Sequence, residues 1–221
     1  MKYLLRIGMF IITFVLSIGL ALTGCDGEKN DNNKLLLLLV NNLNSKIFIF
    51  PAGKLNDADF KTAGGGADGR EGADNLCKAA ASPGGAFSFL SGKTIKAFIS
   101  VSGTDQIKDV VPPAFQELPV YGIKSNGVQT LLKSSWTGLW NNTGIEATMN
   151  AATGIDSGWW NGSNVDGTYK GDNSSCSQWT SSSSTNPPIG EGGNHTQTNF
   201  YWIDSFNATC GYDNFLLCVA Y

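Results

Sequence analysis

Five cysteines carry most of the chemistry that this sequence offers, and the first has a different context from the rest. Cys25 closes the tetrapeptide LTGC at residues 22–25, which follows two basic residues, Lys2 and Arg6, and an almost wholly apolar stretch at 7–22. This arrangement is typical of a lipoprotein signal peptide, because small residues fit the cleavage site and the thiol accepts a diacylglycerol. We therefore predict that residues 1–24 are removed and that Cys25 is lipidated. An ordinary secretory signal with an incidental cysteine is the alternative.

The remaining cysteines, Cys77, Cys176, Cys210 and Cys218, belong to a chain that we expect to be exported, and an oxidising compartment favours disulfides. Three pairings are possible. The nested one, Cys77–Cys218 with Cys176–Cys210, closes the longest loop and restricts the unfolded chain most, but this preference alone leaves the connectivity open. A zinc site is the alternative, and it is disfavoured because the chain has no CxxC pair.

Groups for acid–base or nucleophilic catalysis are scarce. His195 is the only histidine, and a catalytic triad would need it to join a serine, with Asp204 as the orienting carboxylate. The histidine lies in the segment GGNHT at residues 192–196, which carries no nucleophile motif such as GxSxG. A histidine in a surface loop is the simpler interpretation, and we predict that the protein is not an enzyme.

Ligand-binding loops are also weakly indicated. The glycine-rich stretch at 64–72 lacks the Gly-Lys-Ser/Thr of a phosphate-binding loop, so we interpret it as a turn into a helix that Asp68 or Asp74 stabilises at its start. Loop aspartates could supply oxygens to calcium, but they match no recognised ligand spacing. We predict no metal and no cofactor. These aspartates are Asp57 and Asp59, or Asp156, Asp166 and Asp172.

Two adjacent tryptophans, Trp159 and Trp160, are the strongest candidates for contact with a partner. They lie in the Gly- and Asn-rich segment DSGWWNGSN, and if that segment is extended, the two rings cannot both face inward. An exposed tryptophan is a natural hot spot for protein recognition. Packing of a long loop is the alternative. Trp179 and Trp202, which lie near cysteines, are most simply core residues.

The hydrophobic pattern predicts the elements that position these residues. The chain of 221 residues has 15 Lys and Arg against 18 Asp and Glu, a balance that argues against nucleic-acid binding. We expect a polar tether at 25–45, with a short helix at Leu35–Val40, and one domain at 46–221. The domain has an α+β pattern with long irregular loops, above all at 153–199. We expect strands at 46–50, where Pro51 stops the first one, and at 94–102, 200–206 and 215–221, and a helix at 72–82.

The cysteine-bearing segments carry a family resemblance. GADNLC at residues 72–77, followed by IKAFIS at 95–100, resembles the corresponding stretch of endostatin, as do CSQW at 176–179, Cys210 and LLCV at 216–219. Behind a lipobox, the same elements resemble the leptospiral endostatin-like outer-membrane lipoproteins. The match covers roughly residues 46–221.

The resemblance implies a C-type-lectin-like α+β fold with nested disulfides, Cys77–Cys218 and Cys176–Cys210. It also implies an adhesin on the outer membrane and cell surface, since relatives bind host proteins such as laminin, fibronectin, plasminogen or factor H. Endostatin's zinc and heparin sites are not implied, because this chain has a single histidine and, after cleavage, the single arginine Arg70. A structural envelope lipoprotein without a soluble partner is the alternative.

Overall fold

The C-terminal strand β8 (Asn214–Ala220) lies at the centre of the fold. The structure, a computed structural model, describes residues 45–185 and 187–221, and residues 45–221 form one compact unit. Along one edge, β8 pairs with the antiparallel strand β1 (Ile47–Leu55). Its other edge is shared by two short strands, the antiparallel β2 (Ile95–Ala97) and the parallel β5 (Trp159–Trp160). Three segments that are distant in the sequence therefore depend on the last strand.

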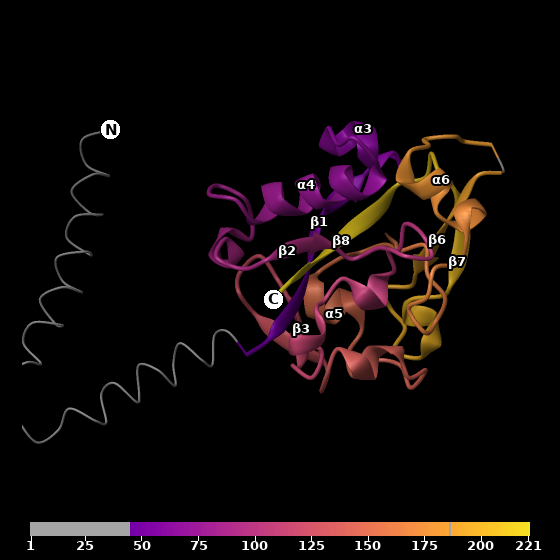
Figure 1. Ribbon diagram of the computed structural model, residues 1–221. Helices are drawn as coiled ribbons and strands as arrows, with labels where there is room; N and C mark the ends of the chain where they lie inside the picture. Colours follow the sequence, from indigo (N-terminus) through magenta and orange to yellow (C-terminus); the bar gives the residue numbers. More distant parts are fainter. Residues whose placement is uncertain (1–44, 186) are drawn as a thin grey trace, which may run out of the picture. The chain divides into compact units, whose positions relative to one another are not determined.

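The strands form one mixed sheet of eight strands in the order β4-β3-β1-β8-β5-β6-β7, with β2 attached to β8. Figure 1 shows the helices α3 and α4 beside one face of this sheet and α5 beside the other. The remaining strands are β3 (Val120–Ile123), β4 (Gln129–Lys133), β6 (Ile189–Gly193) and β7 (Phe206–Thr209). The α-helices are α3 (Phe60–Gly64), α4 (Gly69–Ala81), α5 (Met149–Thr153) and the turn α6 (Cys176–Trp179). The 3₁₀ turns are η1 (Ser88–Leu90), η2 (Ile107–Asp109), η3 (Pro113–Phe115), η4 (Thr137–Trp140), η5 (Asp172–Ser174) and η6 (Phe200–Trp202).

Helix α4 begins three residues before the predicted position because Asp68 caps it. The Asp68 side chain accepts a hydrogen bond from the backbone N–H of Glu71, whereas Asp74 lies within the helix. Its glycines permit close backbone packing: a Cβ at Gly72 would lie 2.0 Å from the carbonyl oxygen of Phe60. In the structure, the glycine-rich stretch therefore serves close packing of the backbone.

Both faces of β8 are buried, and its residues alternate between two hydrophobic clusters. Leu216 and Cys218 pack in the cluster that includes α4, and Leu217 and Val219 pack in the cluster on the opposite face. The strand predicted at 215–221 is confirmed, and its side chains alternate between the two faces as in any extended strand. The strand predicted at 94–102 is confirmed only for Ile95–Ala97, although Ile95, Ala97, Ile99 and Val101 share one cluster.

Two further strand predictions are wrong. The first strand continues through Pro51 to Leu55, because its register shifts between Pro51 and Gly53, and a bulge accommodates the missing N–H of proline. The expected strand at 200–206 is instead the 3₁₀ turn η6, and β7 begins only at Phe206.

Two nested disulfides connect these elements. Cys77 on α4 is bonded to Cys218 on β8, and Cys176 is bonded to Cys210, so the second bridge lies within the loop that the first one closes. This pairing is the one that the family resemblance implies. In the chain-entropy model, a disulfide stabilises the fold more when it closes a longer loop. The bridge Cys77–Cys218, with a sequence separation of 141, contributes about 5 kcal/mol, and the bridge Cys176–Cys210, with a separation of 34, contributes about 4 kcal/mol.

Candidate functional site

The tryptophans predicted to contact a partner are completely buried. Trp159 and Trp160 form β5, which lies between β8 and β6, and this part of the sheet is covered on both faces. Their side chains alternate, as in any strand, but each face has its own hydrophobic layer. Trp159 stacks on Phe98 with the ring centroids 5.3 Å apart, and Trp160 lies against Trp179 on the other face. The prediction that one of them is exposed is therefore wrong.

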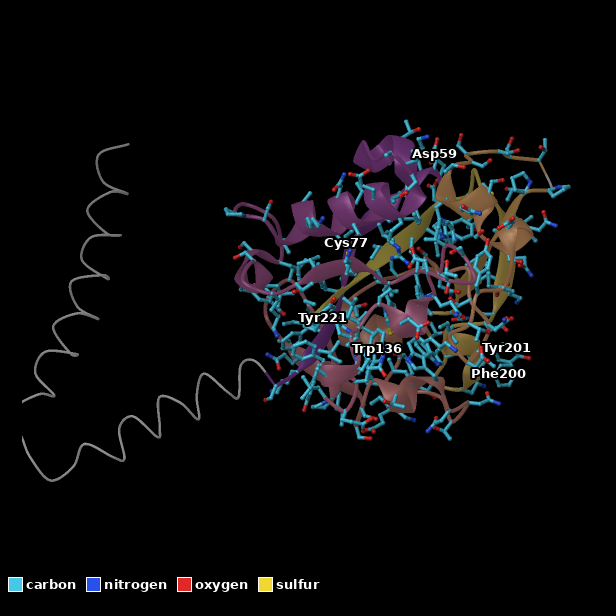
Figure 2. All side chains as sticks on the ribbon, viewed as in Figure 1. Asp59, Cys77, Trp136, Phe200, Tyr201 and Tyr221 are labelled. Carbon is cyan, nitrogen blue, oxygen red and sulfur yellow. A yellow bond between two sulfur atoms is a disulfide. The ribbon has the colours of Figure 1, made fainter. Side chains whose placement is uncertain are left out.

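A different aromatic pair lies at the surface. Phe200 and Tyr201 are 42% and 45% exposed, and their ring centroids are 4.1 Å apart. Both belong to η6, in the connection between β6 and β7, and Figure 2 shows them at the outside of the domain. Large exposed aromatic groups that lie together are typical of protein-binding surfaces.

The connection that carries this pair, residues 194–205, is fixed at its base. The next two residues in the chain, Trp202 and Ile203, are buried in the core, and the indole N–H of Trp159 donates to the carbonyl of Trp202 at 3.2 Å. The Asn161 amide donates to the carbonyl of Ile203 at 2.7 Å. The aromatic pair is therefore attached to the interior of the domain by its immediate neighbours.

Further hydrogen bonds, from the backbone and from one side chain, fix other parts of the connection. The N–H of Asn194 donates to the carbonyl of Tyr201 at 3.0 Å, and the side chain of Asn199 accepts from the N–H of Tyr201 at 3.1 Å. On the other side, the N–H of Ile145 donates to the carbonyl of Thr198 at 2.7 Å. A loop ordered before binding loses little conformational entropy when a partner arrives. We call residues 194–205 the aromatic loop.

Sequence reasoning placed Phe200 and Tyr201 in a strand and missed their exposure. Two features of the sequence could have indicated otherwise. Asn199 is a typical capping residue at the start of a helical turn, and the polar run NHTQTN at 194–199 is typical of a surface loop.

A partly buried ionic cluster joins the aromatic loop to β6. Lys170 donates to Glu191 on β6 at 2.8 Å and to Asp204 in the aromatic loop at 2.7 Å. Glu191 is 1% exposed, and burial raises the pKa of its carboxyl to about 7, although Lys170 lowers it and Asp204 raises it further. Lys170 thus connects three segments: its own loop, β6 and the aromatic loop.

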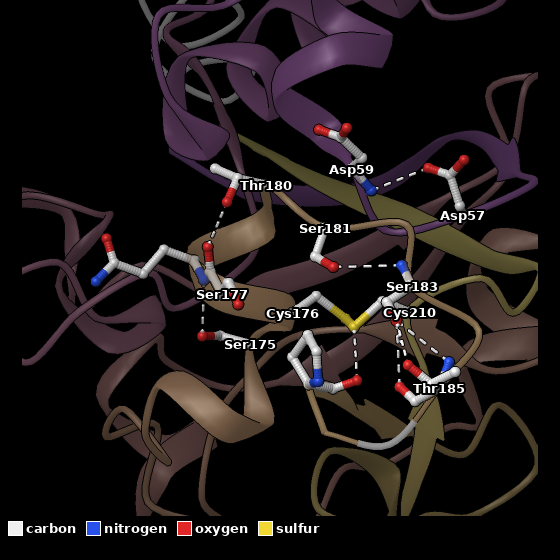
Figure 3. Close-up of a disulfide and its surroundings, with 12 residues drawn as sticks. Asp57, Asp59, Ser175, Cys176, Ser177, Thr180, Ser181, Ser183, Thr185 and Cys210 are labelled. Carbon is white, nitrogen blue, oxygen red and sulfur yellow. Dashed lines mark hydrogen bonds between the residues drawn. A yellow bond between two sulfur atoms is a disulfide. The ribbon is translucent and has the colours of Figure 1, made fainter.

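A left-handed turn lies at the inner disulfide. The residues of α6, Cys176 to Trp179, all have positive φ, between 49° and 64°, and none is glycine. Such a conformation costs roughly 1–2 kcal/mol per residue and needs strong anchors. The anchors are the disulfide to Cys210, the buried Trp179 indole, which donates to the Ser100 carbonyl at 2.7 Å, and Ser175, whose hydroxyl accepts from the N–H of Gln178 (Figure 3).

A groove of about 650 Å³ is lined by residues of β7, by the turn from β7 into the start of β8, and by Lys54 near the end of β1. Tyr212, Lys54 and Asp213 are among its lining residues, and Tyr212 is strongly exposed. The hydroxyl of Ser157, which also lines the groove, is buried without a hydrogen-bond partner among the described residues.

The structure does not bring the hypothetical triad together. Asp204 is engaged by Lys170, whereas His195 is a partly exposed residue in a turn, and its carbonyl accepts from the N–H of Asn150. No hydrogen bond or ion pair joins the His195 ring to Asp204 within residues 45–185 and 187–221.

Four of the five loop aspartates have local structural partners, and the fifth, Asp156, is exposed. Asp57 accepts from the N–H of Asp59, and Asp59 caps α3. Asp166 accepts from Thr168, and Asp172 accepts from Tyr169. In the part of the chain that the structure describes, no group of three or more His, Cys, Asp and Glu side chains could hold a metal ion.

Two predictions lie outside the described residues: lipidation of Cys25 with removal of residues 1–24, and the short helix at Leu35–Val40. Among the residues that are described, no helix is long and apolar enough to cross a membrane.

Comparisons with known proteins do not assign a function to these residues. No protein-family model matches the chain, and no curated protein is significantly similar to it. The resemblance to the endostatin-like lipoproteins thus depends on the cysteine-bearing segments themselves.

Proposed function

We propose that this chain is a lipid-anchored adhesin of a bacterial outer membrane, which binds a host protein at the cell surface. The single observation that carries the binding role is the aromatic loop, in which Phe200 and Tyr201 are exposed on a base fixed to the core. A paired aromatic surface of this kind binds a protein by excluding water, and pre-ordering of the loop reduces the entropy cost.

Further support comes from the sequence and from the mixed α+β architecture. The lipobox at residues 22–25 supports the anchor on Cys25, and the cysteine-bearing segments support a C-type-lectin-like, endostatin-like domain. The nested disulfides Cys77–Cys218 and Cys176–Cys210 agree with that proposal and suit a protein exposed to an oxidising environment.

The test is binding of the soluble, oxidised chain of residues 26–221 to immobilised laminin, fibronectin, plasminogen and factor H. The variant F200A/Y201A should bind at least about 30-fold more weakly, because hot-spot residues contribute 2 kcal/mol or more. The matched control is F89A, since Phe89 is 51% exposed but belongs to η1. Binding by the unchanged chain should persist at high salt, because the contact depends on aromatic surface rather than on charge.

Each result has a distinct meaning. Full binding by F200A/Y201A would exclude the aromatic loop as the contact. No binding to any of the host proteins by a sample with intact disulfides would favour the alternative, a structural envelope lipoprotein.

The anchor is tested separately in cells. Labelling with a radioactive palmitate should mark the unchanged chain, and the variant Cys25→Ser should lose the label. A label that persists in Cys25→Ser would contradict the proposed lipidation site.

A further inference from the structure

A groove of about 510 Å³ lies between the end of α4 and the start of β2. Its charged lining residues are all lysines, namely Lys78, Lys93 and Lys96. Three hydroxyl side chains, a proline and two aliphatic residues complete the lining, and no carboxylate is among these residues: Ser82, Ser91, Thr94, Pro83, Ala81 and Ile95. We call this feature the lysine groove. It is a local concentration of positive charge on a chain whose formal net charge is −3.

Two of the three ammonium groups have no carboxylate partner within residues 45–185 and 187–221. Lys96 is paired with Asp74 at 2.8 Å. Lys93 is half-buried, donates to the carbonyl of Lys46 at 3.3 Å and lies over the Phe48 ring, 5.4 Å from its centroid, and burial lowers its pKa. Lys78 is exposed in the last turn of α4. A half-buried ammonium without a carboxylate partner is stabilised when an anionic ligand binds beside it.

Two hydrogen-bond acceptors lie near the lysine groove, and both already accept hydrogen bonds. Asp74 accepts from Lys96 and from the backbone N–H of Ala97. The main-chain oxygen of Tyr221, at the carboxyl end of the chain, accepts from the N–H of Thr94 at 3.0 Å. Neither accepts from Lys78 or Lys93, so the positive charge of these two lysines is left available to a ligand.

The lysine groove lies at the end of the domain where the chain arrives from the lipid-bearing segment. Lys93 contacts Lys46, the residue before β1, and β2 begins beside the last residues of β8. Figures 1 and 2 show that β1 starts, and the chain ends, on the side of the domain opposite to Phe200 and Tyr201. A surface that contacted the membrane here would leave the aromatic loop facing outward.

We propose that the lysine groove binds the phosphate groups of anionic lipids in the membrane that holds the anchor, and thereby orients the aromatic loop away from that membrane. This inference rests on the lipid anchor of the proposed function. Residues 25–44 keep the domain within about 70 Å of the anchor even when fully extended, so the groove meets headgroups at a high effective concentration. Each lysine near an anionic bilayer surface strengthens binding about fivefold.

In the test, a synthetic lipid coupled to Cys25 takes the place of the natural lipid anchor. The mature chain, residues 25–221, is coupled through the Cys25 thiol to a maleimide lipid in vesicles of phosphatidylcholine, with or without phosphatidylglycerol. Acetylation of individual lysines by an N-hydroxysuccinimide ester is then followed by mass spectrometry, with Lys61 on α3 as the internal reference. We expect Lys78 and Lys93 to react about fivefold more slowly on the anionic vesicles, and high salt to restore their rates.

Variants separate the lysine groove from general charge. K78Q/K93Q should abolish the protection of the remaining groove residue, Lys96. The matched control K54Q/K124Q removes the same charge elsewhere, keeps Lys61 as the reference and should retain that protection. Equal acetylation rates on anionic and neutral vesicles would overturn the inference. Equal protection by inorganic phosphate without vesicles would also overturn it, because the groove would then be a site for free phosphate.

Failure of the membrane-contact proposal can be distinguished from failure of the adhesin proposal. Host-protein binding is measured on the same vesicles. Loss of lysine protection with host binding retained refutes only the membrane contact, and loss of host binding with lysine protection retained refutes only the adhesin assignment.

Discussion

Trp159 and Trp160 are adjacent in the chain, but their rings belong to different hydrophobic clusters on opposite faces of the sheet. The indole N–H of Trp159 donates to the Trp202 carbonyl at 3.2 Å, whereas the indole N–H of Trp160 is buried with no partner among the described residues. The pair therefore connects the two layers of the core, and both rings are buried within it.

The different partners of the two indoles predict different costs of substitution. Trp159→Phe loses a hydrogen bond and leaves the Trp202 carbonyl unpaired, whereas Trp160→Phe removes a buried donor that already lacked a partner. Both replacements remove a similar volume, so we expect Trp159→Phe to be the more destabilising by about 1 kcal/mol or more. Denaturant unfolding of the two variants measures the difference. A larger cost for Trp160→Phe would contradict the assigned hydrogen bond.

The periodic elements were predictable because burial imposes alternation. The residues at 215–221 alternate between two apolar sets, and β8 places the sets on opposite faces. Helix α4 was predictable from its apolar spacing and from the Pro-Gly-Gly sequence after it, and Asp68 supplied the expected cap.

The candidate site was less predictable, because exposure depends on tertiary covering rather than on local sequence. Trp159 and Trp160 lie in a Gly- and Asn-rich segment that is typical of a surface loop, but β6 and β8 enclose it. Conversely, Phe200 and Tyr201 form an aromatic run with Trp202, and only Trp202 reaches the core. The local sequence does not determine which of three consecutive aromatic side chains packs into the core.

The left-handed turn predicts a stabilising glycine. Ser177 has φ 55° and ψ 54° and is exposed, so Ser177→Gly should raise the free energy of unfolding by about 0.5–1 kcal/mol, because glycine has no Cβ penalty in this conformation. The control is Ser91→Gly, since Ser91 is exposed but has φ −58°. That substitution should destabilise the fold. Equal destabilisation by both changes, measured by thermal unfolding with the disulfides intact, would contradict the left-handed turn.

The two disulfides are expected to differ in their contribution to stability. Removal of the outer bridge by C77A/C218A should cost more than removal of the inner bridge by C176A/C210A, because the outer loop is longer. The inner variant should also increase hydrogen exchange at Gln178 and Trp179, whose left-handed turn loses an anchor. Denaturant unfolding and exchange mass spectrometry test the two expectations. Unchanged exchange at α6 in C176A/C210A would mean that Trp179 and Ser175 alone hold the turn.

The buried carboxyl of Glu191 predicts a pH dependence of stability. Burial raises its pKa from an ordinary value of 4.5 to about 7, so between these values the folded state binds more protons than the unfolded chain. The contribution of Glu191 to the free energy of unfolding is therefore greatest below about pH 4.5 and falls as the pH rises through 7. Since one pKa unit corresponds to about 1.4 kcal/mol, the change is measurable by denaturant unfolding.

The variant Glu191→Gln isolates this contribution, because the amide does not titrate. The stability of the unchanged protein relative to Glu191→Gln should decrease between pH 5 and pH 8, while the control Glu146→Gln, at an exposed carboxyl, should show no such trend. Because Lys170 and Asp204 are the charged groups that engage Glu191, ionisation above pH 7 also alters the cluster that holds the aromatic loop. A difference between the unchanged protein and Glu191→Gln that is independent of pH would mean that Lys170 keeps the carboxylate ionised throughout.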